Sequence, residues 1–182
     1  MYINIEKTLE QIWNCAADIT DLHKAYELTL RLQSQLLALI YDTEVFSGPT
    51  GQERLADRKS FGQCNTGTVT LVLEEPLPSM KRLTEAVEEH WKAMIHAAIS
   101  KAAQQESLPY FEKAMVEIEI ITPKGTNNAQ AWDTSNRAIQ LILNNLKGIF
   151  FRDDNMEHMA FSVVGKWGEK GVTIIRISAF DK

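Results

Sequence analysis

The strongest constraint on the fold is a change in hydrophobic period near residue 68. Before that point, apolar residues recur every three or four positions, as they do along one face of an α-helix. After it, three segments alternate apolar and polar residues, which is typical of strands with one buried face. These segments are residues 68–73, 116–121 and 172–177. The chain therefore combines a helical N-terminal part with a part that contains both helices and strands.

The N-terminal part, residues 1–46, is predicted to form a helical hairpin. A short helix over residues 5–18 would precede a long helix that ends near residue 44, with Asp21 as the N-cap of the long helix. The long helix has an apolar face formed by Leu28, Leu32, Leu36 and Leu39. This face packs either on the rest of the same chain or on a second copy in a dimer, and the sequence leaves both alternatives open.

The remainder of the chain is predicted to be a linker followed by one α+β domain. Residues 47–66 are polar and rich in glycine, which is typical of a linker or mobile loop. Residues 67–182 follow the order β-α-β-α-β-β, with helices over Leu83–Ala103 and Asp133–Gly148, a strand over 161–164 and a turn at 168–171. This order predicts an α+β sandwich with helices on one face of a mixed sheet.

Composition narrows the class of protein further. The chain has 182 residues, 45% of them hydrophobic, with only 9 Gly and 5 Pro, which excludes collagen-like and disordered proteins. No apolar run approaches the roughly 20 residues of a membrane span, and the N-terminus lacks the pattern of a secretory signal. We therefore expect a cytoplasmic protein that does not act at a membrane. Cys15 and Cys64 are expected to be free, buried thiols.

Charge is distributed unevenly along the chain. The net charge of −5 argues against indiscriminate binding to nucleic acid. Residues 121–182, however, carry eight Lys and Arg against six Asp and Glu, so any contact with phosphates is expected there. The candidate nucleic-acid-binding residues are Lys124, Arg137, Lys147, Arg152, Lys166 and Arg176. The alternative is an ordinary solvated surface.

The two histidines of the first domain helix do not form a metal site. His90 and His96 lie six positions apart, which places them on different faces of the helix, so they cannot share a metal. They are predicted to be surface or partly buried residues.

The densest polar cluster flanks the predicted second helix of the domain. Asp133 stands at its start, and Asp153 and Asp154 follow its end. Two or three carboxylates that converge would bind a hard divalent cation such as Mg²⁺, which could promote phosphodiester hydrolysis. A helix of about 15 residues is some 22 Å long, so its two ends meet only if the loops fold back. The alternatives are an N-cap role for Asp133 and an ordinary turn at Asp153 and Asp154.

Residues 67–178 resemble the RusA family of Holliday-junction resolvases. The family motif opens a helix with Asp-x-Asp-Asn and has a lysine three residues after the asparagine. After a Leu-x-Gly helix end, it continues with an Asp-Asp pair before a strand. The matching segments here are Asp133-Thr134-Ser135-Asn136, Leu146-Lys147-Gly148 and Asp153-Asp154. The chain departs from the motif at Ser135, where the family has its second aspartate, and at Ile139, where it has the lysine.

The resemblance implies a site and a function. Asp133, Asp153 and Asp154 would be the catalytic carboxylates, with Asp133 and Asp154 as ligands of Mg²⁺ or Mn²⁺ and Asn136 in a structural role. The implied activity is a metal-dependent, structure-selective endonuclease on branched DNA, acting as a homodimer. Ser135 and Ile139 predict that this activity is weakened. The alternative is a catalytically silent module of the same fold that binds DNA or a protein.

Overall fold

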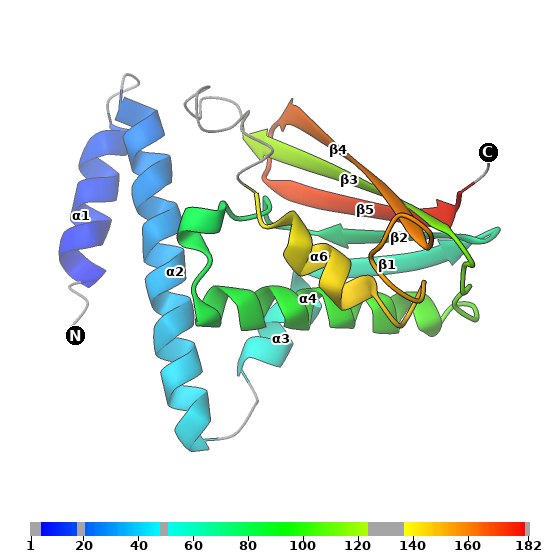
Figure 1. Cartoon of the computed structure of the whole chain (residues 1–182). Coiled ribbons are helices and arrows are strands. Elements are labelled where there is room, and N and C mark those ends of the chain that lie inside the picture. Colours follow the sequence, from blue (N-terminus) through cyan, green and yellow to red (C-terminus); the bar gives the residue numbers. More distant parts are fainter. Residues whose placement is uncertain (1–4, 18–20, 48–50, 124–136, 181–182) are drawn as a thin grey trace.

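The structure is a computed structural model that describes residues 5–17, 21–47, 51–123 and 137–180 (Figure 1). The helices are α1 (Ile5–Ala16), α2 (Leu22–Ser47), α3 (Gly51–Arg58), the short 3-10 helix η2 (Met80–Arg82), α4 (Glu85–Ala103) and α6 (Ile139–Leu146). The strands are β1 (Ser60–Asn65), β2 (Thr68–Leu73), β3 (Ala114–Pro123), β4 (Met159–Gly168) and β5 (Val172–Ala179). The predicted α+β fold is confirmed.

The five strands form one mixed sheet in the order β1-β2-β5-β3-β4. Only β3 and β4 are parallel, and α6 lies between them in the chain, as a parallel connection requires. The predicted turn at 168–171 does not close a simple hairpin. It carries the chain over the end of β3, so that β4 and β5 lie on opposite sides of that strand (Figure 1).

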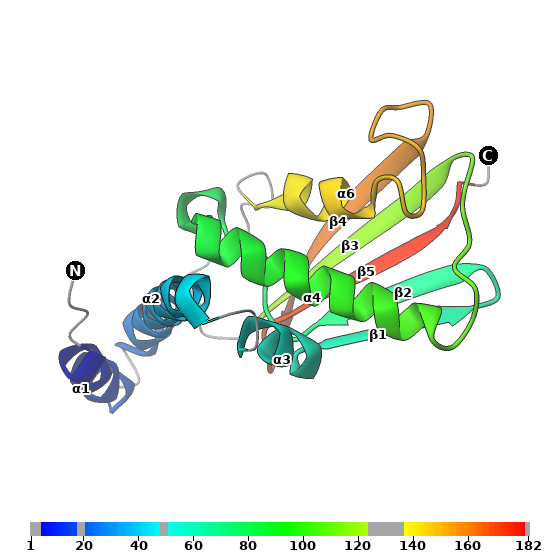
Figure 2. The ribbon, with the colours of Figure 1, turned by 90° about the horizontal axis from the view of Figure 1, so that it is seen from below.

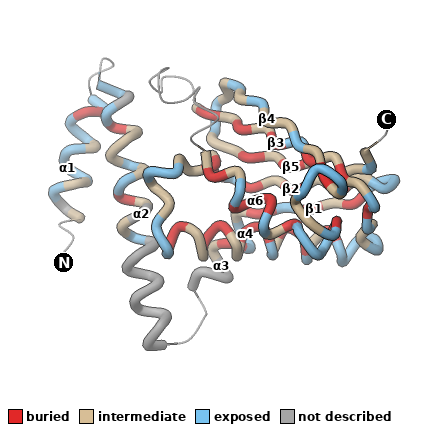
Figure 3. Tube along the Cα trace, in the orientation of Figure 1, coloured by how far each residue is buried: buried red, intermediate tan, exposed pale blue. Residues whose placement is uncertain are grey.

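The helices α4 and α6 cover one face of this sheet, as predicted (Figure 2). Every second residue of β2 and β3 is buried, and these residues meet the apolar sides of the two helices. Trp91, Met94 and Ile142 are among the buried residues. Figure 3 shows buried positions along α4, α6 and the strands. Burial of one such side chain contributes about 2 kcal/mol, so this layer holds most of the fold's hydrophobic stabilisation.

The prediction of a linker over 47–66 is wrong for residues 51–65, which form α3 and β1. The glycine at position 62 does not break the chain. A Cβ there would overlap the backbone carbonyl of Ala98, so glycine lets β1 pass directly against α4. Lys101 of α4 donates to the carbonyl oxygen of Ser60 at 2.9 Å and pairs with Asp57 at 2.9 Å. The domain therefore begins with α3, not at residue 67.

The N-terminal helices α1 and α2 run antiparallel and contact each other, which confirms the predicted hairpin (Figure 1). The helix α2 also contacts α4, and Glu27 of α2 forms an ion pair with Arg82 of η2. The two cysteines are free and buried, as expected. Among the described helices, none has the length and apolar character that a bilayer crossing requires.

Candidate functional site

The loop between α6 and β4 carries the predicted acidic pair. Asp154 lies alongside α6, where its Oδ2 accepts a hydrogen bond of 2.7 Å from Gln140 in the first turn of that helix. Its Oδ1 is 3.3 Å from Nζ of Lys147, which follows the last turn. Lys147 Nζ also lies 3.4 Å from Oδ1 of Asp153. The loop therefore folds back over the whole length of α6, as the metal-site hypothesis required.

Local sequence explains why the loop takes this path. Gly148 ends the helix with φ of 79°, a left-handed conformation that glycine adopts readily. Phe150 and Phe151 are fully buried and anchor the chain that follows. Beyond them, Asp153 Oδ1 accepts the backbone N–H of Asp154 at 3.0 Å, a short-range turn contact typical of aspartate. The contact fixes the backbone of Asp154, while its carboxylate is oriented by Gln140 and Lys147.

Electrostatics favour the charged forms of Asp154 and Lys147. The ammonium of Lys147 is the main cause that lowers the pKa of Asp154, followed by a backbone hydrogen bond and Gln140. In return, Asp154 raises the pKa of Lys147. Carboxylate oxygens suit Mg²⁺ or Mn²⁺, so the donor chemistry fits a hard cation. Lys147 is nevertheless already the counter-ion of both carboxylates, and among the described residues no three acidic, histidine or cysteine side chains group around one point.

The first half of the predicted motif lies outside the described residues. This applies to Lys124, Asp133, Ser135 and Asn136. The described chain resumes at Arg137, and α6 begins at Ile139 with Ala138 in the N-cap position. The predicted helix over 133–148 is thus described only as Ile139–Leu146, and its predicted start at Asp133 lies outside the described residues.

Arg137 has a structural role in the described fold. Its guanidinium donates to the carbonyl oxygen of Leu77 at 2.7 Å, and its backbone forms an isolated β-bridge with Ser79. These contacts fix the start of α6 against the segment that leads into η2. The side chain is half-buried, so its predicted contact with phosphate must compete with this internal contact.

Two other predicted phosphate contacts lie on the sheet face opposite the helices. Lys166 of β4 and Arg176 of β5 both pair with Glu119 of β3, at 3.0 and 3.2 Å. Burial raises the pKa of Glu119, but the two cations more than offset this and hold it below its usual range. The positive charge of both residues is thus partly neutralised within the fold. Arg152 is exposed, and no described side chain pairs with it.

A second polar cluster, not predicted from the sequence, is buried between the sheet and α4. Glu75 Oε1 lies 2.5 Å from Nζ of Lys59 and 3.1 Å from Nε2 of His90. His90 is fully buried, which corrects the prediction of a surface or partly buried position. Its Nδ1 has no hydrogen-bond partner within the described structure. Glu75 and His90 are buried and only Lys59 reaches the solvent, so the cluster fits a structural role better than a binding role.

A third feature that sequence reasoning missed is a cleft between the hairpin and the domain. Three basic side chains line it, two from α2 and one from η2. Their spacing along α2, positions 24 and 31, was visible in the sequence as a polar helix face, but the partner wall from η2 was not.

Comparison with known proteins adds no relative, because no protein-family model, curated protein or solved structure matches the chain.

Proposed function

We propose that this protein is a divalent-metal-dependent, structure-selective endonuclease of the RusA kind, acting on branched DNA in the cytoplasm. The observation that supports it is the hydrogen bond between Asp154 and Gln140. It brings the acidic loop to the first turn of α6, and Asp133 lies only six residues before Ile139 in the sequence. Asp154 therefore lies at the end of α6 that is nearer to Asp133 in the sequence, which supports a site shared by the two carboxylates.

The roles of the residues follow from their chemistry. Asp154 and Asp133 would hold Mg²⁺ or Mn²⁺, and Asp153 would add negative charge beside them. The metal would supply the polarisation of a water molecule and of the scissile phosphate. Gln140 orients the Asp154 carboxylate through a hydrogen bond of 2.7 Å, and the Asp153 carboxylate fixes the backbone of Asp154 at 3.0 Å. Lys147 provides a positive charge next to the acidic pair. The lysine of the family motif corresponds to position 139, at the other end of α6.

A homodimer suits this activity, because a four-way junction has two-fold symmetry. The outer side of α1 supports it. Leu9 and Trp13 lie one helical turn apart and are 51% and 77% exposed. Adjacent exposed side chains of this size are typical of a surface that another protein covers.

A second candidate is a catalytically silent module that binds DNA through the same fold. The ion pairs of Lys147 favour it, because the ammonium occupies the side of Asp153 and Asp154 where a metal ion would bind. The substitutions at Ser135 and Ile139 relative to the family motif favour it as well. The two candidates share DNA as the ligand and differ in whether a metal ion binds at Asp154.

An Asp154→Asn variant separates these candidates. The wild type is assayed for cleavage of a four-way DNA junction with Mn²⁺, and its melting temperature is measured with and without Mn²⁺. A nuclease predicts cleavage that falls by at least about a hundredfold in the variant, since lost electrostatic stabilisation of this kind is worth some 3 kcal/mol. It also predicts that Mn²⁺ raises the melting temperature of the wild type only.

Glu157→Gln is the matched control, because Glu157 is an exposed acid of the same loop whose side chain contacts neither Lys147 nor Gln140 within the described structure. It should behave as the wild type in both assays. Junction binding without cleavage, and without a Mn²⁺ shift, would support the silent module instead. Absence of junction binding would refute both candidates.

A further inference from the structure

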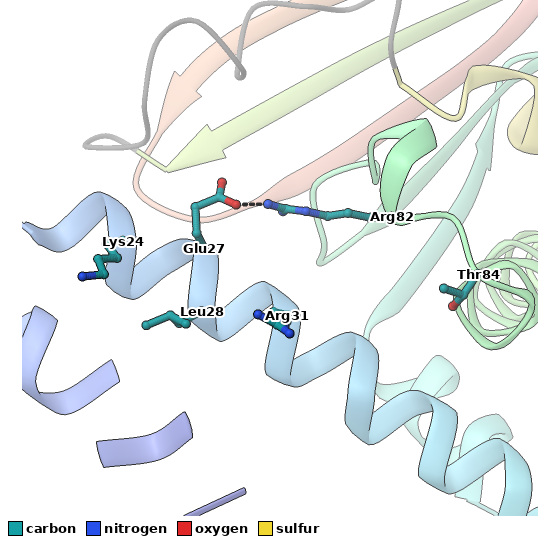
Figure 4. A pocket seen from close by; sticks show the side chains of 6 residues that line it. All are labelled: Lys24, Glu27, Leu28, Arg31, Arg82 and Thr84. Atoms are coloured by element: carbon teal, nitrogen blue, oxygen red, sulfur yellow. Dashed lines mark hydrogen bonds and ion pairs between the residues drawn. The ribbon is translucent and has the colours of Figure 1, made fainter. Parts of the chain in front are cut away.

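The cleft between α2 and η2 is a cavity of about 380 Å³ lined by Lys24, Glu27, Leu28, Arg31, Arg82 and Thr84. Figure 4 shows Glu27 and Arg82 reaching toward each other across the gap between the two elements. Glu27 is the only acidic residue among those that line the cleft, and this ion pair neutralises it together with Arg82, one of the three cations. The remaining two cations, Lys24 and Arg31, therefore determine the charge of the cleft.

Lys24 and Arg31 are available for a ligand. Both are exposed, and neither forms an ion pair or hydrogen bond with another described residue. Their seven-residue separation places them on the same face of α2, two turns apart. Leu28 lies between them and adds an apolar side chain to the lining of the cleft.

The spacing of the two cations indicates the kind of anion. At 1.5 Å per residue, the two positions are about 10 Å apart along the axis of α2. Two phosphates of one nucleic-acid strand can occupy these two positions, because phosphates repeat along the chain and arginine and lysine are their usual partners. The charge and the spacing together favour an extended phosphodiester backbone over a small anion.

The cleft is also connected to the candidate nuclease site. Arg82 of its wall belongs to η2, and the segment leading into η2 is bridged to the start of α6 by Ser79 and Arg137. Arg137 and Arg82 both lie close enough to Tyr26 of α2 to oppose the rise in its pKa that burial causes. A strand held in the cleft would thus be led toward the first turn of α6, where Asp154 bonds to Gln140.

We propose that Lys24 and Arg31 bind the phosphodiester backbone of a DNA strand in the cleft between α2 and η2. This inference deepens the proposed function, because it names a second contact with the same substrate. It assigns the helical hairpin a role in binding DNA that does not depend on metal or cleavage.

The test measures binding of a fluorescent four-way junction in EDTA, where no cleavage occurs, over a series of salt concentrations. The double variant Lys24→Ala/Arg31→Ala should bind at least about tenfold more weakly at 100 mM salt. The slope of log K against log salt should fall by roughly 1.4 to 1.8, which corresponds to two lost phosphate contacts. A purely structural role for these exposed residues would not change this slope.

The control Arg58→Ala/Lys113→Ala removes the same two charge types outside the cleft and should leave the slope unchanged. Equal slopes for the wild type and the Lys24→Ala/Arg31→Ala variant would overturn the inference, as would a wild type that does not bind the junction at low salt. Displacement of the junction by a polyglutamate peptide as readily as by an oligonucleotide would overturn the assignment to nucleic acid. If binding depends on the cleft but cleavage is absent, the inference stands and the nuclease proposal fails.

Discussion

Glu75 is a buried acid whose charge depends on two neighbours. Burial raises the pKa of its carboxyl group, but the contacts with His90 and Lys59 more than offset this and lower it overall. Folding therefore favours the ionised form. The resulting stabilisation is present above the pKa of the unfolded chain, near 4.5, and is lost as the pH falls through the lower folded value.

We expect Glu75→Gln to lower the free energy of unfolding at pH 7 by about 2 kcal/mol, because Gln keeps the shape but leaves the charge of Lys59 unbalanced. The difference from the wild type should shrink as the pH falls through the lowered pKa of Glu75, where its carboxyl group becomes neutral. Urea unfolding across this pH range measures both effects. Glu89→Gln, which alters an exposed pair with Lys92, should change stability by less than about 0.5 kcal/mol at every pH. A constant difference between Glu75→Gln and the wild type would contradict the linkage.

At the scale of elements, the segments whose side chains alternate were predictable. The strand over 68–73 was predicted to the residue. The strand predicted over 116–121 is two residues longer at both ends, and the strand predicted over 172–177 is two residues longer at its C-terminal end. Glu117 and Glu119 lie opposite the core, as the alternation in the sequence indicates. Each of these segments has one buried and one open face, so apolar and polar residues alternate along it and the sequence alone predicts a strand.

The elements that could not be predicted depend on distant contacts. Helix α3 and strand β1 are polar and glycine-containing, and only the close approach of α4 explains why Gly62 lies in a strand. Likewise, the sequence marked Asp153 and Asp154 as candidates, but their contacts with Lys147 and Gln140 depend on how the loop folds back over α6. His90 was misplaced because its acidic partner lies in another segment of the chain.

The role of β1 leads to a prediction about Gly62→Ala. The added methyl group would meet the carbonyl of Ala98, so β1 and α4 must move apart. We expect the free energy of unfolding to fall by about 2 kcal/mol or more, as is typical of an overpacked interface. Gln63→Ala, on the next residue and the opposite face, should stay within about 0.5 kcal/mol of the wild type. If Gly62→Ala is equally stable, residues 60–65 do not pack against α4 as described.

At the scale of the whole molecule, the hairpin has two proposed roles, which are DNA binding and dimer formation. Its inner side, facing η2, carries Lys24 and Arg31 for a DNA strand, and α1 exposes Leu9 and Trp13. The sheet offers a competing surface, because the face opposite the helices has Phe61 and Val164, each about half exposed, at its two edges. A dimer could use either surface, and the two arrangements would place the clefts of the two copies differently.

We expect the dimer to form through α1, because Trp13 is 77% exposed whereas Phe61 of the sheet is 49% exposed. Leu9 extends the apolar surface of Trp13 by one turn. Light scattering should give the wild type a mass of twice 20.6 kDa, and Leu9→Ser/Trp13→Ser a mass near 20.6 kDa. Both side chains are exposed, so the variant should retain the wild-type circular dichroism spectrum. Phe61→Ser/Val164→Ser tests the competing surface and should remain a dimer. The reverse result would place the interface on the sheet, and a monomeric wild type would remove the dimer from the proposed function.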